Sequence, residues 1–296
     1  MSPGDWLVTV ELFSEHERPG WREFVAGRSV RLAAVFHDAI PLRLPDVTWP
    51  QSVQRHPEYM KTLAAFDRVW AVSKASLEDL TGFWRWQGTA VRAAVSTLEL
   101  GADFDGSARQ TEPAEPGGKR PQLLCVGIVE PRKNQAFLAA IGEQLWNAGL
   151  DFDLHVVGRT NPHFGAPMVT QLKRVQSREQ RLHVHGAIDD RRLHTLYAGA
   201  ALVLFPTVAE GCGLPLLESL WRGVPCVASD LPSLRESAAS GGCALVPPND
   251  AGAWVAKLRE LLVNPAARSA LRVEAVSRPL PRWKETAQAL LDGLSR

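Results

Sequence analysis

Short apolar runs alternate with longer amphipathic patterns through the second half of the chain. The runs hold four to seven residues each, which is typical of buried parallel strands. Patterns with apolar residues three and four positions apart fall between them and predict helices. The expected strands are 122–128, 152–157, 182–185, 201–205, 225–228 and 243–246, and the helices between them are 134–148, 167–177, 191–200, 214–222 and 234–239.

This alternation predicts an α/β fold with a doubly wound parallel sheet, in which ligands bind outside the carboxyl ends of the strands. Three more helical patterns finish the chain, and the first hundred residues are less regular. The late helices are expected at 250–262, 266–275 and 283–294, the early strands at 6–12, 30–36, 68–72 and 95–100, and the early helices at 58–65 and 75–83.

The segment 106–121 is rich in Pro and Gly and poor in apolar residues, so we expect a linker there. It divides the chain into an N-terminal domain, 1–105, and a C-terminal domain, 122–276. The last stretch, 277–296, is expected to form a helix that packs back on the N-terminal domain.

Composition narrows the class of protein. The net charge is +1 with acids and bases evenly mixed, which argues against nucleic-acid binding. No apolar run approaches the ~20 residues of a membrane span, and the first residues lack the charged region from which a signal peptide would be expected. The four cysteines lack metal-ligand spacing, so we expect reduced thiols and a cytoplasmic protein. Among the ten tryptophans, those of Phe83-Trp84-Arg85-Trp86 are either core residues or part of an acceptor or membrane-interface patch.

The stretch 205–219 is the most informative. Glu210 and Glu218 flank a glycine-bearing turn between a predicted strand and a helix with Pro215 at its start. Such a turn directs backbone N–H groups and a helix dipole at one point, which suits a sugar diphosphate. The alternative is a plain turn, with Glu210 solvated and Glu218 in the first helical turn.

Other strand ends carry residues that suit a ligand. Arg132 and Lys133 follow the strand at 122–128, where a helix N-terminus disfavours cations unless an anion binds. Asn134 is expected to cap that helix.

Arg159 follows the next strand, and small residues at 186–188 could let a base lie against the backbone. Asp189 is expected to cap a helix, and Ser73 another. In the first domain, His37 ends the strand at 30–36.

Taken in chain order, segments from about residue 30 onward resemble the retaining GT-B glycosyltransferases of family 4, in particular mannosyl- and rhamnosyltransferases of bacterial surface polysaccharides. The most specific are EGCGLP…E, with Cys212 where the family has Phe, and GVPCVASDLPSLRE. The supporting segments are FHDAIPLRLP, FDRVWAVSKAS, LELGAD, VGIVEPRKN, VVGR and HGAIDD.

The resemblance implies two Rossmann-like domains facing a cleft, a nucleotide-diphosphate sugar as co-substrate and no metal or other cofactor. It implies that His37 and Glu210 act in catalysis, with Glu210 also near the sugar hydroxyls and Glu218 on the ribose. The other implied donor-binding residues are Arg132, Lys133, Arg159, Ala187, Ile188, Gly211, Cys212, Gly213 and Leu214.

The implied activity is hexose transfer with retention to a glycan or lipid-linked acceptor. A GDP-sugar is slightly favoured as donor, and the implied location is cytoplasmic, with peripheral contact at the inner membrane face left open. The family usually has a longer N-terminal domain with a glycine-rich first loop, so the N-terminal domain is expected to be reduced or truncated here. A non-catalytic nucleotide-sugar-binding partner subunit is therefore the alternative, ahead of a phosphorylase or a sucrose-synthase-like enzyme. No GxGxxG supports a dehydrogenase.

Overall fold

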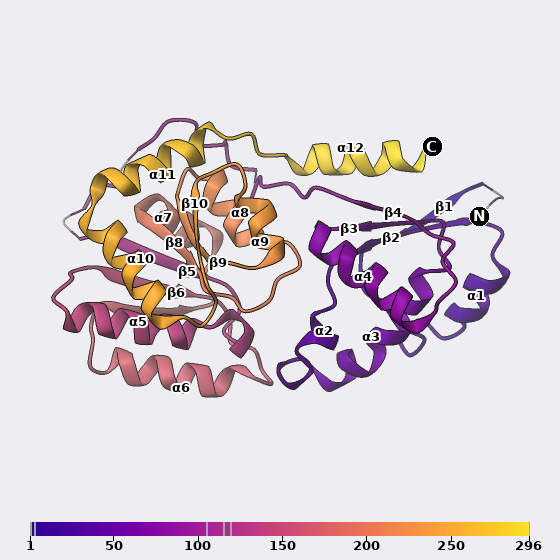
Figure 1. Ribbon diagram of the computed structural model, residues 1–296, viewed down its shortest axis with the longest axis horizontal. Coiled ribbons are helices and arrows are strands. Elements are labelled where there is room, and N and C mark those ends of the chain that lie inside the picture. Colours follow the sequence, from indigo (N-terminus) through magenta and orange to yellow (C-terminus); the bar gives the residue numbers. More distant parts are fainter. Residues whose placement is uncertain (1, 3, 105, 115, 119, 296) are drawn as a thin grey trace. The chain divides into compact units, whose positions relative to one another are not determined.

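The computed structural model describes residues 2, 4–104, 106–114, 116–118 and 120–295. The chain forms two compact units (Figure 1). The N-terminal unit contains 1–100, Glu210–Cys212 and Trp283–Arg296, and the C-terminal unit contains Gly101–Ala209 and Gly213–Arg282.

The N-terminal unit is built on a parallel sheet in the order β1-β2-β3-β4. Its strands are β1 Trp6–Thr9, β2 Arg31–Phe36, β3 Arg68–Ala71 and β4 Ala94–Thr97. Its helices are α1 Trp21–Gly27, α2 Ile40–Arg43, α3 Pro50–Leu63, α4 Lys74–Gln87 and α12 Trp283–Leu294, with a short 3-10 turn η1 at Pro45–Val47.

The core of this unit lies where helices pack on the central strands. β2 is buried from its second residue to its last, because β1 and β3 pair with it on either side. The indole of Trp84 in α4 is buried as well, and its Nε1 donates to the Met60 carbonyl at 2.6 Å. Burial of such a ring stabilises the unit by removing a large apolar area from water.

The predicted start of the helix at 58 is wrong. α3 begins at Pro50, a favoured first helical residue, and continues through Pro57. The expected helix began directly after Pro57, and an internal proline removes one helical hydrogen bond. Packing of the buried His56, Tyr59, Met60 and Leu63 outweighs that loss. The short helices α1 and α2 were not predicted.

The C-terminal unit contains a parallel sheet in the order β10-β9-β8-β5-β6-β7, which confirms the predicted doubly wound arrangement. Its strands are β5 Gln122–Val126, β6 Asp153–Val157, β7 Leu182–Gly186, β8 Ala200–Phe205, β9 Cys226–Ser229 and β10 Cys243–Val246. Its helices are α5 Gln135–Asn147, α6 Gly165–Gln176, α7 Asp190–Gly199, α8 Leu214–Trp221, α9 Pro232–Ala238, α10 Ala251–Val263 and α11 Pro265–Ser277, with a 3-10 turn η2 at Pro131–Lys133.

The helices of this unit cover both faces of its sheet, as Figure 1 shows. α10 packs beside α5, and α11 packs beside α8. One large apolar cluster runs between the sheet and the α5, α6 and α10 helices, and includes the fully buried Trp254.

The segment predicted as a linker, 106–121, packs along the C-terminal unit. The indole Nε1 of Trp221 donates to the Ser107 carbonyl at 3.1 Å, and the Arg109 guanidinium donates to the Val276 carbonyl at 3.2 Å. The described part of the segment has no helix or strand, yet side chains of the unit hold it.

The last helix, α12, contacts the sheet of the N-terminal unit. The Thr286 hydroxyl donates to the Glu99 carbonyl at 2.9 Å. A Cβ added at Gly293 would lie 2.6 Å from the Trp70 ring, so the helix approaches β3 closely.

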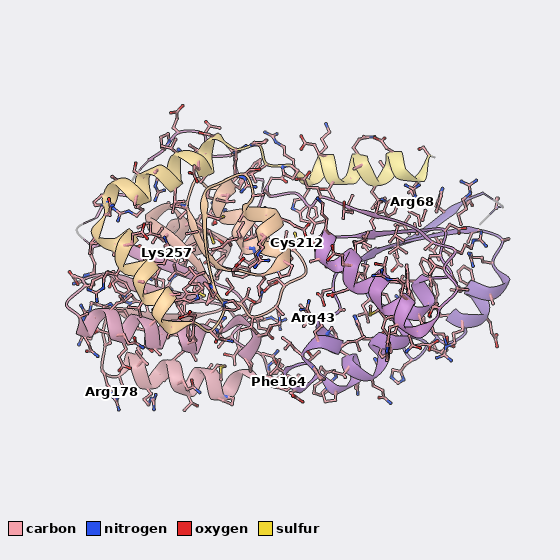
Figure 2. The ribbon with its side chains drawn as sticks, viewed as in Figure 1. Arg43, Arg68, Phe164, Arg178, Cys212 and Lys257 are labelled. Atoms are coloured by element: carbon pink, nitrogen blue, oxygen red, sulfur yellow. The ribbon has the colours of Figure 1, made fainter. Side chains whose placement is uncertain are left out.

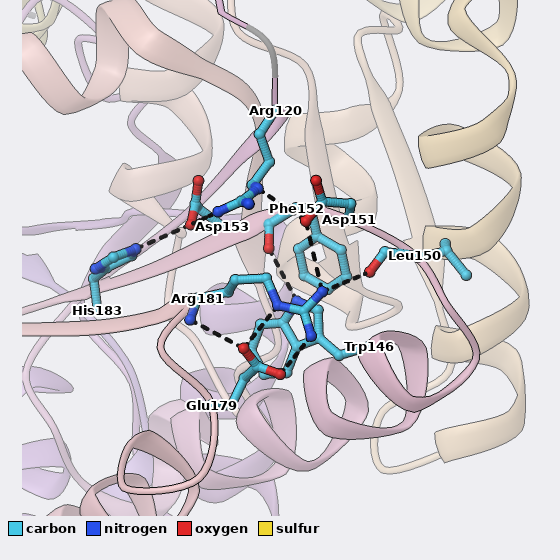
Figure 3. Close-up of polar contacts among 9 residues, drawn as sticks. All are labelled: Arg120, Trp146, Leu150, Asp151, Phe152, Asp153, Glu179, Arg181 and His183. Atoms are coloured by element: carbon cyan, nitrogen blue, oxygen red, sulfur yellow. Dashed lines mark hydrogen bonds and ion pairs between the residues drawn. The ribbon is translucent and has the colours of Figure 1, made fainter.

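Charged residues tie together the starts of β6 and β7 (Figure 3). Arg120 pairs with Asp151 at 2.9 Å and with Asp153 at 3.3 Å, and Arg181 pairs with Glu179 at 2.5 Å. The Arg181 guanidinium also lies 5.6 Å from the centre of a tryptophan ring in α5. This network lies at the opposite end of the sheet from the carboxyl ends of the strands, so we assign it a structural role.

None of the helices in the described part of the chain is long and apolar enough to span a membrane.

Candidate functional site

The sheet of the C-terminal unit reverses its winding between β5 and β8. The chain adds β6 and β7 on one side of β5, then returns to place β8, β9 and β10 on the other. In open parallel sheets the crevice at such a switch point, outside the carboxyl ends of the strands, is the usual ligand site. The loops that follow β5 and β8 therefore define the candidate site.

Lys133 lies in the loop after β5, and its side chain runs beside Gly127. A Cβ added at Gly127 would lie 3.7 Å from the Lys133 Cδ. The ammonium lies 5.0 Å from the centre of the Phe205 ring, which ends β8. Lys133 thus brings a positive charge to the switch point, where a cation–π contact holds it.

Arg132 connects the two loops. Its guanidinium pairs with the carboxylate of the buried Glu130 at 2.8 Å and donates to the Ala209 carbonyl at 2.9 Å. The Val208 N–H donates to the backbone carbonyl of Arg132 at 2.9 Å, and the Thr207 hydroxyl donates to the same oxygen at 3.2 Å. The predicted donor-binding role of Arg132 stays a prediction, and these contacts give the residue a bracing role as well.

The predicted cap by Asn134 is wrong. Its backbone is left-handed, with φ 60°, and its side chain makes no cap hydrogen bond. The amide instead donates to the Asn249 side chain at 2.9 Å. The neighbouring Gln135, which the sequence interpretation overlooked, is buried and donates to the carbonyls of Gly127 and Ile128 at 3.3 and 2.9 Å.

The turn after β8 ends where α8 begins. Gly213 precedes Leu214 with φ 88°, a conformation that favours glycine. A Cβ at Gly213 would lie 2.3 Å from a Leu234 methyl group, so the position is closed to side chains. The N-terminus of α8, with its positive dipole end, therefore lies beside the β8 end.

Glu218 lies in the second turn of α8, which excludes the first-turn dipole role considered above. The hydroxyl of the buried Tyr197 donates to its carboxylate at 3.4 Å. Burial, followed by the charge of Glu218, raises the pKa of Tyr197 well above its usual value, so the phenol stays a donor. This contact orients the carboxylate.

The ends of β5 and β6 touch through their glycines. A Cβ added at Gly158 would lie 1.9 Å from the Gly127 carbonyl oxygen. Arg159, the next residue, is exposed, and its carbonyl accepts the Val129 N–H at 2.9 Å. The glycines let the loops after β5 and β6 lie against one another.

Ala187 and Ile188 follow β7, directly after Gly186, whose φ is 68°. Ala187 is exposed and Ile188 is half-buried. The predicted cap is confirmed, since the Asp189 carboxylate accepts the Arg192 N–H at 2.8 Å. The Ser73 cap in the N-terminal unit is confirmed in the same way.

Three histidines of β6 and β7 stack on one another, and the sequence interpretation overlooked them. The ring of His155 in β6 stacks on His183 and His185 of β7 at 4.6 and 5.2 Å. Asp153 lies 3.1 Å from His183 Nε2. Burial, then repulsion by His183 and His185, lowers the pKa of His155 to about 4, so it is neutral at pH 7. The alternation HVH in 183–185 was the available signal.

The remaining predicted residues fall in the N-terminal unit. His37 directly follows β2, and its exposed ring places Nε2 2.8 Å from the Val10 carbonyl. Glu210, Gly211 and Cys212 group with this unit. The Ser76 hydroxyl donates to the Gly211 carbonyl at 3.3 Å, and Glu210 is half-buried.

Among the described residues, no group of three or more His, Cys, Asp or Glu side chains could hold a metal ion. All four cysteines are free. Burial raises the pKa of the Cys125 thiol to about 12, so this thiol is unreactive at neutral pH.

Residues 120–264, which lie in the C-terminal unit, match the family described as glycosyl transferases group 1. The chain superposes on the sucrose-phosphate synthase of Thermosynechococcus elongatus with a TM-score of 0.73 and 20% identity, over 93% of this chain and 70% of that chain. That neighbour is a GT-B glycosyltransferase, so the predicted α/β GT-B fold class is confirmed.

The curated relatives include mannosyltransferases. The serotype-specific mannosyltransferase WbdA of Escherichia coli is 31% identical over 229 residues, which cover 71% of this chain and 28% of that protein. The O-antigen chain mannosyltransferase B of Escherichia coli is 26% identical over 254 residues, covering 83% of this chain and 65% of that protein. The chain thus spans less than a third of the first relative and about two thirds of the second.

Proposed function

We propose that this chain transfers a hexose, with mannose as first candidate, from a nucleotide-diphosphate sugar to a glycan or lipid-linked acceptor with retention of configuration. The observation that supports this most is the switch point between β5 and β8, where the Lys133 ammonium and the N-terminus of α8, the helix that carries Glu218, offer positive charge. The mannosyltransferase relatives favour mannose and, with it, a GDP-sugar donor.

The chemistry requires stabilisation of a leaving diphosphate. As the bond between the sugar anomeric carbon and the phosphate oxygen breaks, negative charge grows on the diphosphate. Lys133 and the backbone N–H groups at the start of α8 stabilise that charge, which is usually the largest catalytic contribution. Glu218 accepts hydrogen bonds from the ribose hydroxyls. Ala187 and Ile188 line the site of the base.

The acceptor oxygen forms the new bond to the same carbon and on the same face that the leaving group occupied. Its proton passes to the departing diphosphate oxygen, so charge and atoms balance without a further co-reactant. We assign Glu210 to the hydroxyls of the transferred sugar and His37 to the acceptor side, and Arg159 to the donor phosphates.

Transfer by the full-length chain tests this proposal. We expect it to release GDP from GDP-mannose in the presence of a mannose-containing oligosaccharide and to form a product whose anomeric configuration matches the donor's, as read by NMR. Because charged side chains and N–H groups provide the stabilisation, we expect the same rate in EDTA. Donor binding without any transfer would favour the non-catalytic partner subunit, and an absolute need for Mg²⁺ or Mn²⁺ would refute metal independence.

Substitution of the two glutamates should affect different quantities, GDP affinity for Glu218 and turnover for Glu210. Glu218→Ala should weaken GDP binding about 10- to 100-fold, since a charged partner of the ribose is lost. Glu210→Ala should lower kcat more than it changes GDP affinity, because the role assigned to Glu210 is toward the transferred sugar, which GDP lacks. Calorimetry with GDP and initial rates with GDP-mannose separate the two effects.

Two controls sharpen this comparison. Glu218→Gln keeps the shape and removes the charge, so it should lie between wild type and Glu218→Ala. Glu260→Ala removes an exposed carboxylate of α10 that pairs with Lys257, and it should change neither quantity. Equal GDP affinity and equal rates in all variants would refute the assigned roles.

We also propose a cytoplasmic location with peripheral contact at the inner membrane face.

A further inference from the structure

One end of the N-terminal unit collects cations and an exposed tryptophan. In a parallel sheet the connecting helices end where the next strands begin. The backbone shows this directly, because the N–H of Arg92, just before β4, donates to the carbonyl of Ala64, just after α3, at 2.8 Å. We use the term basal end for the end of the unit at which β2, β3 and β4 begin.

Six cations lie at or beside this basal end. Arg28 follows α1, Lys61 lies in the last turn of α3, and Arg85 lies in the last turn of α4. Arg31 begins β2, Arg68 begins β3, and Arg92 precedes β4. The exposed members are Lys61, Arg85, Arg31 and Arg92, whereas Arg28 and Arg68 are half-buried.

Two adjoining cavities open at this end, with volumes of about 320 and 500 Å³. They share Ala26, Arg28 and Arg92. Lys61 lines the larger cavity, and Arg31 lines the smaller.

Their acidic lining is too small to balance the cations. Asp67 pairs with both Arg92, at 2.5 Å, and Arg28, at 3.5 Å. Glu58 pairs with Arg22 at 3.2 Å. One carboxylate shared by two guanidiniums leaves an excess of positive charge, to which Lys61 and other cations of the basal end add.

Trp86 gives this charged end an apolar anchor. It is 77% exposed in the last turn of α4, whereas Trp84, two residues earlier, is 1% exposed. The ring centre of Phe83 lies 6.1 Å from the ring centre of Trp86. Val91, in the turn that leads to β4, is 48% exposed. An exposed indole among cations is the arrangement that inserts at a lipid headgroup region.

We propose that the basal end of the N-terminal unit binds the surface of a membrane that contains anionic phospholipids, with Trp86 inserted among the headgroups and Arg85, Lys61 and Arg92 facing lipid phosphates. This deepens the peripheral contact proposed above and names the surface and the lipid charge. It lies at the ends of the strands opposite to His37, so lipid binding leaves that residue accessible.

Sedimentation of the full-length chain with vesicles tests the proposal without any transfer assay, so its failure is distinct from failure of the proposed activity. The chain should bind vesicles of equal parts phosphatidylglycerol and phosphatidylcholine, and bind pure phosphatidylcholine far more weakly. Each basic residue near an anionic surface adds about fivefold to the affinity, so Arg85→Glu should reduce it at least fivefold. Trp86→Ala should reduce it by a similar factor.

Matched controls locate the contact. Trp49→Ala removes a 40% exposed indole next to the first residue of α3, at the other end of that helix, and Arg178→Glu reverses an exposed cation beyond α6 (Figure 2). Both should bind vesicles as the wild type does, and all variants should unfold at the same urea concentration. Absence of binding to the anionic vesicles overturns the proposal, as does equal loss in the controls. Binding that persists unchanged in about 0.5 M salt would also overturn it.

Discussion

Replacing Lys133 with alanine should raise the Kd for GDP about 10- to 150-fold. A charge-assisted hydrogen bond to phosphate contributes about 1.5–3 kcal/mol, and each 1.4 kcal/mol is a factor of ten. The ammonium lies over the Phe205 ring at the switch point between β5 and β8, where a diphosphate would neutralise it. Titration calorimetry with GDP measures the change.

The same substitution should alter stability little, because a cation–π contact contributes about 0.5–1 kcal/mol. Lys257→Ala is the matched control, since Lys257 lies on α10 (Figure 2) and pairs with Glu260 of the same helix. It should leave GDP affinity unchanged. If Lys133→Ala binds GDP as tightly as this control does, the phosphate role of Lys133 is refuted.

Gly158→Ala should destabilise the C-terminal unit by about 3 kcal/mol or more. Its new Cβ would lie 1.9 Å from the Gly127 carbonyl oxygen, and the backbone φ of 155° disfavours a side chain. Overpacking and backbone strain each cost about 1–3 kcal/mol, and the contact involves main chain rather than a flexible side chain. Urea unfolding followed by tryptophan fluorescence measures the loss.

Gly252→Ala provides the opposite expectation in the same unit. Gly252 lies in α10. The nearest atom to a Cβ added there would be a side-chain oxygen of Asp250, at 3.5 Å. Alanine there should stabilise by up to about 1 kcal/mol, because glycine is the poorer helix former. Equal stability of Gly158→Ala and wild type would contradict the close approach of the β5 and β6 ends.

Hydrophobic pattern alone predicted most of the C-terminal unit. The strand at 243–246 has the predicted bounds, and the other strands of this unit differ by one or two residues at one or both ends. The helix at 283–294, which belongs to the N-terminal unit, also has the predicted bounds. Buried parallel strands are readily predicted because both faces are covered and most of their positions are apolar. The elements of the N-terminal unit were harder to predict, since α1 and α2 are short and α3 contains an internal proline.

The site was predictable as a set of strand ends but not as a set of contacts. Arg132 and Ala209 are 77 positions apart, and no local pattern predicts that a guanidinium binds that carbonyl. Asn134 is a good capping residue by type, but its backbone is left-handed and its side chain donates to Asn249, 115 positions away. No local pattern predicts that contact. The catalytic and donor-binding roles assigned from the resemblance remain predictions.

The bridge made by Arg132 has a consequence for the thermodynamics of ligand binding. Its carbonyl and guanidinium hold the segment 207–209 in the folded protein, before any donor arrives. The conformational entropy of that loop is therefore lost on folding rather than on association. A donor meets a preorganised surface, and more of its interaction energy can appear as affinity.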